Sequence, residues 1–198
     1  SLLYGSNAMG GVVNIITRQH KQQGRRTQAR VMFGSYNTQK YMINNGYNVG
    51  NFSSFVSVNH DRTDGHRPDS KFDITNGFAN LGYQIDDHYK VTGNLSLAKY
   101  NTEDPGMITS PKFDHVMHIL RGTTSFALEN HHEKTSGALR VFYNWGHHKI
   151  NDGYSEGEQP SPFLFYSDDH NTGIQLYQSF RFCLLYTSDA ADDLTRVD

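Results

Sequence analysis

The chain has 198 residues, with 18 lysines and arginines against 20 aspartates and glutamates, and a formal net charge of −2. This near-neutral balance, without any block of basic residues, argues against a nucleic-acid partner. No apolar run approaches the roughly 18 residues of a membrane-spanning helix, whereas tyrosine and phenylalanine are abundant, at 12 each. These features suit an all-β chain, either soluble or a transmembrane barrel, because barrel strands alternate and escape a search for apolar runs.

The first 18 residues, SLLYGSNAMGGVVNIITR, set three glycines around a short polar turn and follow them with a β-branched run. Glycine permits positive φ and close backbone approach, and valine and isoleucine favour extended backbone. The pattern by itself predicts a tight turn that leads into a buried strand.

The same string closely resembles the end of the plug domain of TonB-dependent outer-membrane receptors, where the plug gives way to the barrel. The matching positions are Tyr4, Gly5, Ser6, Ala8, Gly10, Gly11, Asn14, Ile15, Ile16, Thr17 and Arg18. The resemblance implies an architectural role for Gly5, Gly10, Gly11 and Asn14, which would fix the plug inside the barrel. We therefore expect residues 1–19 to end a plug domain and residues 20–182 to form the N-terminal part of the barrel.

Residues 20–182 contain alternating segments separated by turn residues. We expect strands at 27–36, 38–49, 52–62, 71–85, 89–101, 115–130, 134–150 and 170–182. In the clearest of them Val91, Leu95 and Leu97 share one face, while Thr92 and Asn94 share the other. This period of two gives each strand one apolar and one polar face. The predicted fold class is all-β, an antiparallel transmembrane β-barrel fragment of about eight strands, preceded by the last strand of a plug.

The connections between these segments alternate in length. Those at 50–51, 86–88 and 131–133 are short, whereas those at 63–70, 102–114 and 151–169 are long and polar. Short turns on one side and long loops on the other are typical of an outer-membrane barrel, and a soluble sandwich shows no such bias. Aromatic residues near strand ends fit the girdles of such a barrel, namely Tyr83, Tyr89, Tyr100, Trp145 and Tyr154.

Two of the long connections hold the candidate binding residues. The first set is Asp61, Arg62, Asp64, His66, Arg67 and Asp69, and the second is Asp152, Tyr154 and Glu156. Such groups could contact an anionic chelate or bind Ca²⁺ through carboxylates. The alternative is a solvated hairpin loop without a ligand. Neighbouring histidines diverge on strands, so no metal site is predicted, and no motif predicts an enzyme.

Residues 183–198, CLLYTSDAADDLTRVD, differ from everything before them. The string CLLYTSDAADD resembles the conceptual translation of a transposase sequencing adapter, so we expect this segment to be non-native and exclude it from the fold. The alternative is a genuine polar tail. The segment carries the only cysteine, Cys183, together with one arginine and four aspartates, so the net charge of the rest is +1.

The resemblance implies an active importer in the outer membrane of a Gram-negative bacterium, in the cobalamin and siderophore branch of Bacteroidetes receptors. Such a protein binds a scarce metal chelate (siderophore, haem or cobalamin) on its outer face. The TonB complex of the inner membrane then grips a segment upstream of Ser1 and drives release. The expected partners are this complex, the chelate and outer-membrane lipid. The alternative is a passive porin-like or adhesin-type barrel. We expect this length of chain to form an open or artificially closed sheet.

Overall fold

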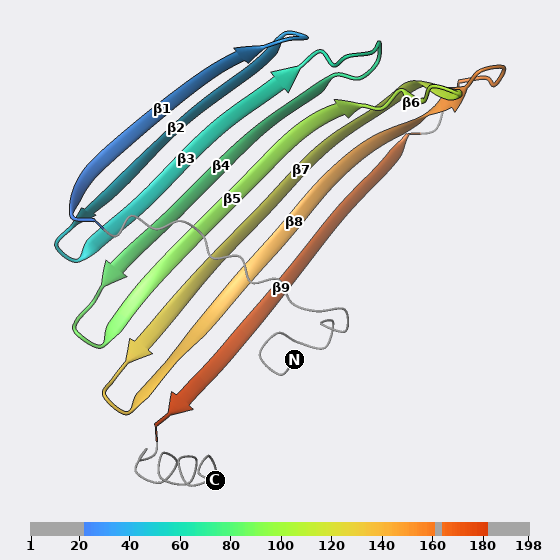
Figure 1. Ribbon diagram of the computed structural model, residues 1–198. Helices are drawn as coiled ribbons and strands as arrows, with labels where there is room; N and C mark the ends of the chain where they lie inside the picture. The colour runs from blue at the N-terminus through green and yellow to red at the C-terminus, as the bar shows by residue number, and fades with distance from the viewer. Residues whose placement is uncertain (1–21, 161–163, 182–198) are drawn as a thin grey trace, which may run out of the picture.

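The computed structural model describes residues 22–160 and 164–181, and they form one antiparallel sheet. Its strands are β1 (Gly24–Gly34), β2 (Thr38–Val49), β3 (Phe52–Thr63), β4 (Phe72–Gln84), β5 (Tyr89–Glu103), β6 (Gly106–Met107), β7 (Ser110–His131), β8 (Thr135–Ser155) and β9 (Phe165–Phe180). The eight long strands lie side by side in chain order as a single curved layer (Figure 1). The all-β antiparallel prediction is confirmed. Within the described ranges no helix is long and apolar enough to cross a membrane.

Most strand positions agree with the sequence prediction, but β7 to β9 extend further toward the long connections. β7 and β8 pair from Lys112 with Ser155 down to His131 with Ser136. At 110–114 and 151–155, where the two strands exceed the prediction, Phe113 and Tyr154 are the only large apolar or aromatic side chains. No regular alternation therefore marks these strand ends, and cross-strand hydrogen bonding defines them. Two of the long connections are therefore shorter than expected, at 104–109 and 156–164, whereas the one at 64–71 has the expected length; the connection at 104–109 contains β6, which the sequence did not predict. The short connections are confirmed, at 50–51, 85–88 and 132–134.

One face of the sheet is apolar over four successive rows of paired residues, which we call the apolar band. On β5, β7 and β8 these rows contain Val91, Leu128 and Leu139; Gly93, Phe126 and Val141; Leu95, Thr124 and Tyr143; and Leu97, Gly122 and Trp145. From β2 to β8 the band holds no Lys, Arg, His, Asp or Glu. Its large side chains lie open, with Phe126 63% exposed and Ile174 on β9 71% exposed. The sheet thus presents a broad uncovered apolar surface.

The opposite face is polar. Its strand residues include a series of amides, Asn44, Asn59, Asn76, Asn80, Asn94, Asn144 and Asn171, and the charged Arg121, Arg140 and Asp169, with Phe55, Phe78 and Phe142 among them. The buried side chains of the described residues, Ala127, Ala138, Asn44, Asn80 and Thr92, all lie on this face. The expected division into one apolar and one polar face is confirmed. Tyr100 and Tyr154 are corrections: Tyr100 pairs with Ile74 and Ile119 on the polar face, and Tyr154 pairs with Phe113 on the same face, so neither belongs with Tyr83 and Trp145.

The sheet is open and has a single layer. β1 and β9 are its edges, and among the described strands neither has a second neighbour. Because no second layer packs on either face of this part of the chain, its buried apolar residues are only Ala127 and Ala138. The glycines and Asn14 of the opening motif, and residues 183–198, lie outside the described residues.

Candidate functional site

Four connections gather at one end of the sheet, which we call the long-loop end. They are the β1–β2 turn and the loops at 64–71, 104–109 and 156–164. Figure 1 shows them at the end where β6 lies, opposite the short turns. Every binding residue that the sequence predicts lies in or beside these connections, so this end is the candidate site.

The β1–β2 turn is tied to the next loop by side-chain and backbone hydrogen bonds. Tyr36 and Asn37 both have positive φ, 57° and 54°, the backbone of a type I′ hairpin turn. The Asn37 amide donates to Asp64 Oδ2 at 3.0 Å, and the Asp64 backbone N–H donates to the Tyr36 carbonyl at 2.9 Å. The Asn37 hydrogen bond, aided by Arg62 at 3.2 Å, lowers the pKa of the Asp64 carboxyl. Ionised Asp64 therefore links the β1–β2 turn to the 64–71 loop.

Arg67 links the 64–71 loop to the β6 hairpin. Its Nη2 donates to the Gly106 carbonyl at 2.7 Å, while its own backbone exchanges hydrogen bonds with Ser70 Oγ. Gly65 has φ 78°, and a Cβ there would overlap Ser70, so the loop closes tightly on itself. Its neighbour His66 lies edge-on to Tyr36, with ring centroids 6.4 Å apart. Loop 64–71 thus has an ordered shape set by its own residues.

The second predicted group surrounds the β7–β8 end. The Tyr154 ring packs on Phe113 with centroids 5.5 Å apart, and the Asp152 carbonyl accepts a hydrogen bond from Lys112 Nζ at 3.5 Å. Glu156 is exposed. Beyond it Glu158 accepts the Ser155 backbone N–H at 2.8 Å, and this bond lowers the pKa of the Glu158 carboxyl. The Tyr154 ring, the Asp152 carbonyl and the Glu158 carboxylate thus shape the hairpin tip, and Glu156 is exposed beside them.

The structure does not bring the two predicted groups together. β5 and β7 lie between the 64–71 loop and the β8 end. Adjacent residues of the first group also lie on opposite faces of the sheet. Asp61 lies on the polar face, 3.3 Å from Lys40 Nζ, whereas Arg62 lies on the apolar face. Asp69 is exposed with φ 57°. Within the described residues no group of three or more His, Cys, Asp or Glu could hold a metal ion, so the carboxylates expected for Ca²⁺ form no cage here. Chelate binding by these residues stays a prediction.

The polar face carries an ordered network that the sequence did not reveal. Asn80 donates to Asn94 at 2.7 Å, and Asn94 to Ser125 Oγ at 3.3 Å, across β4, β5 and β7. Arg121 on β7 reaches Asp169 on β9 at 2.7 Å, passing over Gly146 of β8. A side chain at Gly146 would meet both partners. These contacts depend on the register of three strands, which the sequence alone does not give.

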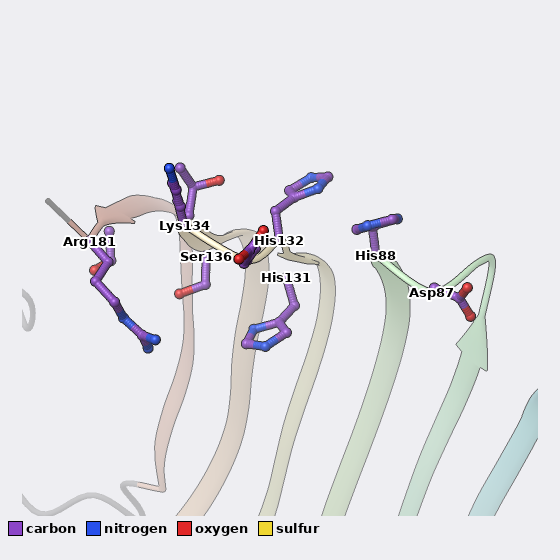
Figure 2. Close-up of a pocket in the computed structure, with 10 residues that line it drawn as sticks. Asp87, His88, His131, His132, Lys134, Ser136 and Arg181 are labelled. Atoms are coloured by element: carbon purple, nitrogen blue, oxygen red, sulfur yellow. The ribbon is translucent and has the colours of Figure 1, made fainter. Parts of the chain in front are cut away.

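A shallow cavity of about 220 Å³ lies at the other end, between the β4–β5 and β7–β8 turns and the end of β9. The imidazoles of His88 and His132 stack across it with centroids 4.6 Å apart. Figure 2 shows His131 and His132 pointing away from each other, as their adjacent positions predicted. Acidic Asp87 and Glu133 and basic Lys134 and Arg181 also line it, so its charge is mixed. It offers no convergent set of groups for one ligand.

The fold and both ends of the sheet define an antiparallel all-β protein with one apolar and one polar face. No protein-family model, curated protein or solved structure matches this chain.

Proposed function

We propose that residues 20–182 are part of the wall of an outer-membrane β-barrel, with the apolar band against lipid and the polar face toward the lumen. One observation carries this: four rows without a charged residue cover one face from β2 to β8, while amides and ion pairs cover the other. A soluble monomer rarely exposes a contiguous apolar surface so large. In a lipid-embedded barrel the same surface contacts the hydrocarbon chains of the membrane and not water.

The dimensions of the apolar band support this assignment. Its four rows are separated by three steps of two residues, so the band extends about 20 Å along the strands at about 3.4 Å per residue. With one flanking row on each side, at Tyr89 and Lys99 of β5, it covers 11 residues, which matches the roughly 9–11 residues that a strand tilted by about 45° needs to cross a bilayer. Tyr83 and Phe52 lie at the short-turn border of the band and Trp145 at its long-loop border, where aromatic side chains suit a membrane interface.

Orientation follows from the connections. Outer-membrane barrels have short periplasmic turns and long external loops. The turns at 50–51, 85–88 and 132–134 would then face the periplasm, and the long-loop end would face outside. An open sheet with two free edges in the described region requires further strands to close it, because an unpaired edge cannot lie in lipid. The wall therefore belongs to a larger barrel.

The transport activity that we propose is TonB-dependent import of a scarce metal chelate, such as a siderophore, haem or cobalamin. Its support is the opening string with Gly5, Gly10, Gly11 and Asn14, which resembles the end of a plug. A plug would occupy the lumen, where the amide-rich face offers it hydrogen bonds. The TonB complex would act on the plug, and the long-loop end would receive the chelate.

Uptake measured with and without a proton gradient tests this function. A strain without the gene should lose accumulation of one labelled chelate under iron or cobalamin limitation, and a plasmid copy should restore it. A protonophore should abolish the restored uptake, because TonB coupling requires the proton motive force. Restored uptake that is insensitive to the protonophore would instead establish the passive porin-like alternative. No change for any chelate, with the protein present on the surface, would favour an adhesin.

A further inference from the structure

From β2 to β9 the lysines and arginines of the apolar face lie at its long-loop end, whereas Arg25 on β1 lies beside Tyr47 in the second row of the band. Two rows lie directly beyond the apolar band, and we call them the charged rows. Their members from β3 to β9 are His60, Thr75, Lys99, Leu120, His147 and Asp168, then Arg62, Asp73, Asn101, His118, Lys149 and Tyr166. At the opposite border the row of Tyr89, Asn130, Gly137 and Gln178 holds no lysine or arginine. From β2 to β9 the face therefore carries lysine and arginine at one membrane border only.

The acids in the charged rows already have partners. Asp73 lies 3.5 Å from His60, Asp168 pairs with His147, and Arg62 reaches Asp64 at 3.2 Å. Lys99 and Lys149, in contrast, have no carboxylate within 4.0 Å among the described residues. Both positive charges thus remain available to an external anion.

Lys99, His118 and Lys149 form one patch, which we call the cationic patch. His118 is directly opposite Lys149 across the β7–β8 pair and one step diagonal to Lys99 on β5. Its Nδ1 is hydrogen-bonded to Asn101 Oδ1 at 2.7 Å, which fixes the ring. Lys149 Nζ lies over the Tyr166 ring, 5.7 Å from its centroid, and this contact holds the ammonium group at the surface. Three neighbouring positions thus present nitrogen groups on the same face.

Apolar surface continues directly below the cationic patch. Leu120 lies between Lys99 and His147 in the first charged row. Leu97 lies in the neighbouring row, which is the first of the apolar band. The side chains of Leu120 and Leu97 are each 37% exposed. A ligand that contacts both the cationic patch and this apolar surface needs an anionic head group and hydrocarbon chains that run along the strands.

We propose that the cationic patch binds a phosphate of lipid A, the phosphorylated glycolipid of the outer leaflet, with its acyl chains over Leu97 and Leu120. The proposal rests on the function above, because it takes the long-loop end as external. The one-sided placement of lysine and arginine from β2 to β9 favours lipid A over a glycerophospholipid, which would occupy the inner leaflet at the border that lacks them on these strands. Each lysine near an anionic membrane surface contributes about 1 kcal/mol to such attraction.

Lipid titration of the purified protein tests the proposal. The protein is first located by membrane fractionation, then extracted in detergent and titrated by native mass spectrometry with lipid A, dephosphorylated lipid A and phosphatidylglycerol. The double variant K99A/K149A should bind lipid A about thirtyfold more weakly than the parent. The control K40A/R140A removes the same charge from the polar face and should stay within about twofold of the parent. K99R/K149R should retain binding and shows that the positions tolerate substitution.

Two results would overturn the proposal while leaving the barrel wall intact. One is equal lipid A affinity in K99A/K149A and the parent; the other is binding of dephosphorylated lipid A or phosphatidylglycerol as tight as that of lipid A. Recovery of the protein outside the outer membrane would instead overturn the proposed function, and this inference with it. The fractionation step separates these failures.

Discussion

The indole of Trp145 lies across Gly122, its partner on the neighbouring strand, so closely that a Cβ at Gly122 would overlap the ring. Tyr143 stacks on the same indole with centroids 5.5 Å apart. The absence of a side chain at Gly122 therefore lets a large aromatic residue lie flat on the apolar band. The indole covers Gly122, which is buried although it belongs to the exposed face.

Gly122→Ala should displace this indole and destabilise the fold. Insertion of a methyl group into a filled position costs about 1–3 kcal/mol. Trp145 is the only tryptophan of the chain, so its emission spectrum reports the displacement directly. Gly77→Ala is the matched control, since Gly77 lies in the same row and a Cβ there meets nothing within 4 Å. An unchanged emission maximum and unfolding midpoint in Gly122→Ala would show that the indole lies elsewhere.

A charge in the apolar band should block membrane assembly, whereas the same charge on the next residue should not. Leu95 lies in the band and Ser96 on the polar face, one position along β5. Arginine near the middle of the lipid-facing belt costs about 2–4 kcal/mol, and a lumen position carries no such cost. We expect Leu95→Arg to lower the amount of protein in outer-membrane fractions severalfold and Ser96→Arg to leave it near the parental amount. Equal recovery of both variants would argue against a lipid-facing band.

Arg67 should hold the β6 hairpin against the 64–71 loop. Arg67→Ala removes the hydrogen bond to the Gly106 carbonyl, so amides of residues 104–112 should exchange hydrogen roughly fivefold faster, the effect of about 1 kcal/mol. Arg62→Ala is the comparison, because Arg62 pairs with Asp64 of its own loop and should leave this segment unchanged. If neither variant alters exchange at 104–112, Arg67 is free to serve the ligand role that its sequence predicts.

Asp86 should make the β4–β5 turn sensitive to acid. Its Oδ1 accepts the backbone N–H groups of His88 and Tyr89, each at 2.8 Å, and these bonds lower the pKa of the carboxyl below the ordinary 3.8. Because the folded-state pKa is the lower one, the stabilisation is complete above about pH 4 and is lost as the pH falls through the folded-state value. Carbon-detected NMR titration should show the depressed midpoint. Asp86→Asn should remove this part of the acid dependence of unfolding, and an Asp86 midpoint at or above 3.8 would contradict the turn geometry.

The strands could be predicted from the sequence where apolar and polar residues alternate regularly, but not where this alternation is absent. Val91, Leu95 and Leu97 identify the apolar face of β5, and their mates on β7 and β8 repeat the pattern, so the face division could be read directly. The strand ends at 110–114 and 151–155 could not, because their residues show no regular alternation and only cross-strand pairing defines them.

Contacts between distant segments were beyond the sequence for a related reason. The Arg67–Gly106 bond and the Arg121–Asp169 pair join residues far apart in the chain, and the second also requires Gly146 at the intervening position. Such contacts depend on strand register, because a slip of one residue would move every side chain of the strand to the opposite face. The candidate residues Asp64, His66, Arg67, Asp69 and Glu156 lie in loops as expected, whereas Asp61 and Arg62 end β3 and Asp152 and Tyr154 end β8. The loop assembly that engages Asp64 and Arg67 could not be foreseen.

Lipid quenching of Trp145 tests most directly whether the apolar band faces the membrane. The protein is reconstituted in vesicles whose acyl chains carry bromine, and Trp145 emission is compared with that in unlabelled vesicles and with added aqueous iodide. The account predicts strong quenching by the brominated chains and little by iodide, because the indole lies on the lipid-facing band. Quenching by iodide with no effect of the brominated chains would place Trp145 in water and contradict the account.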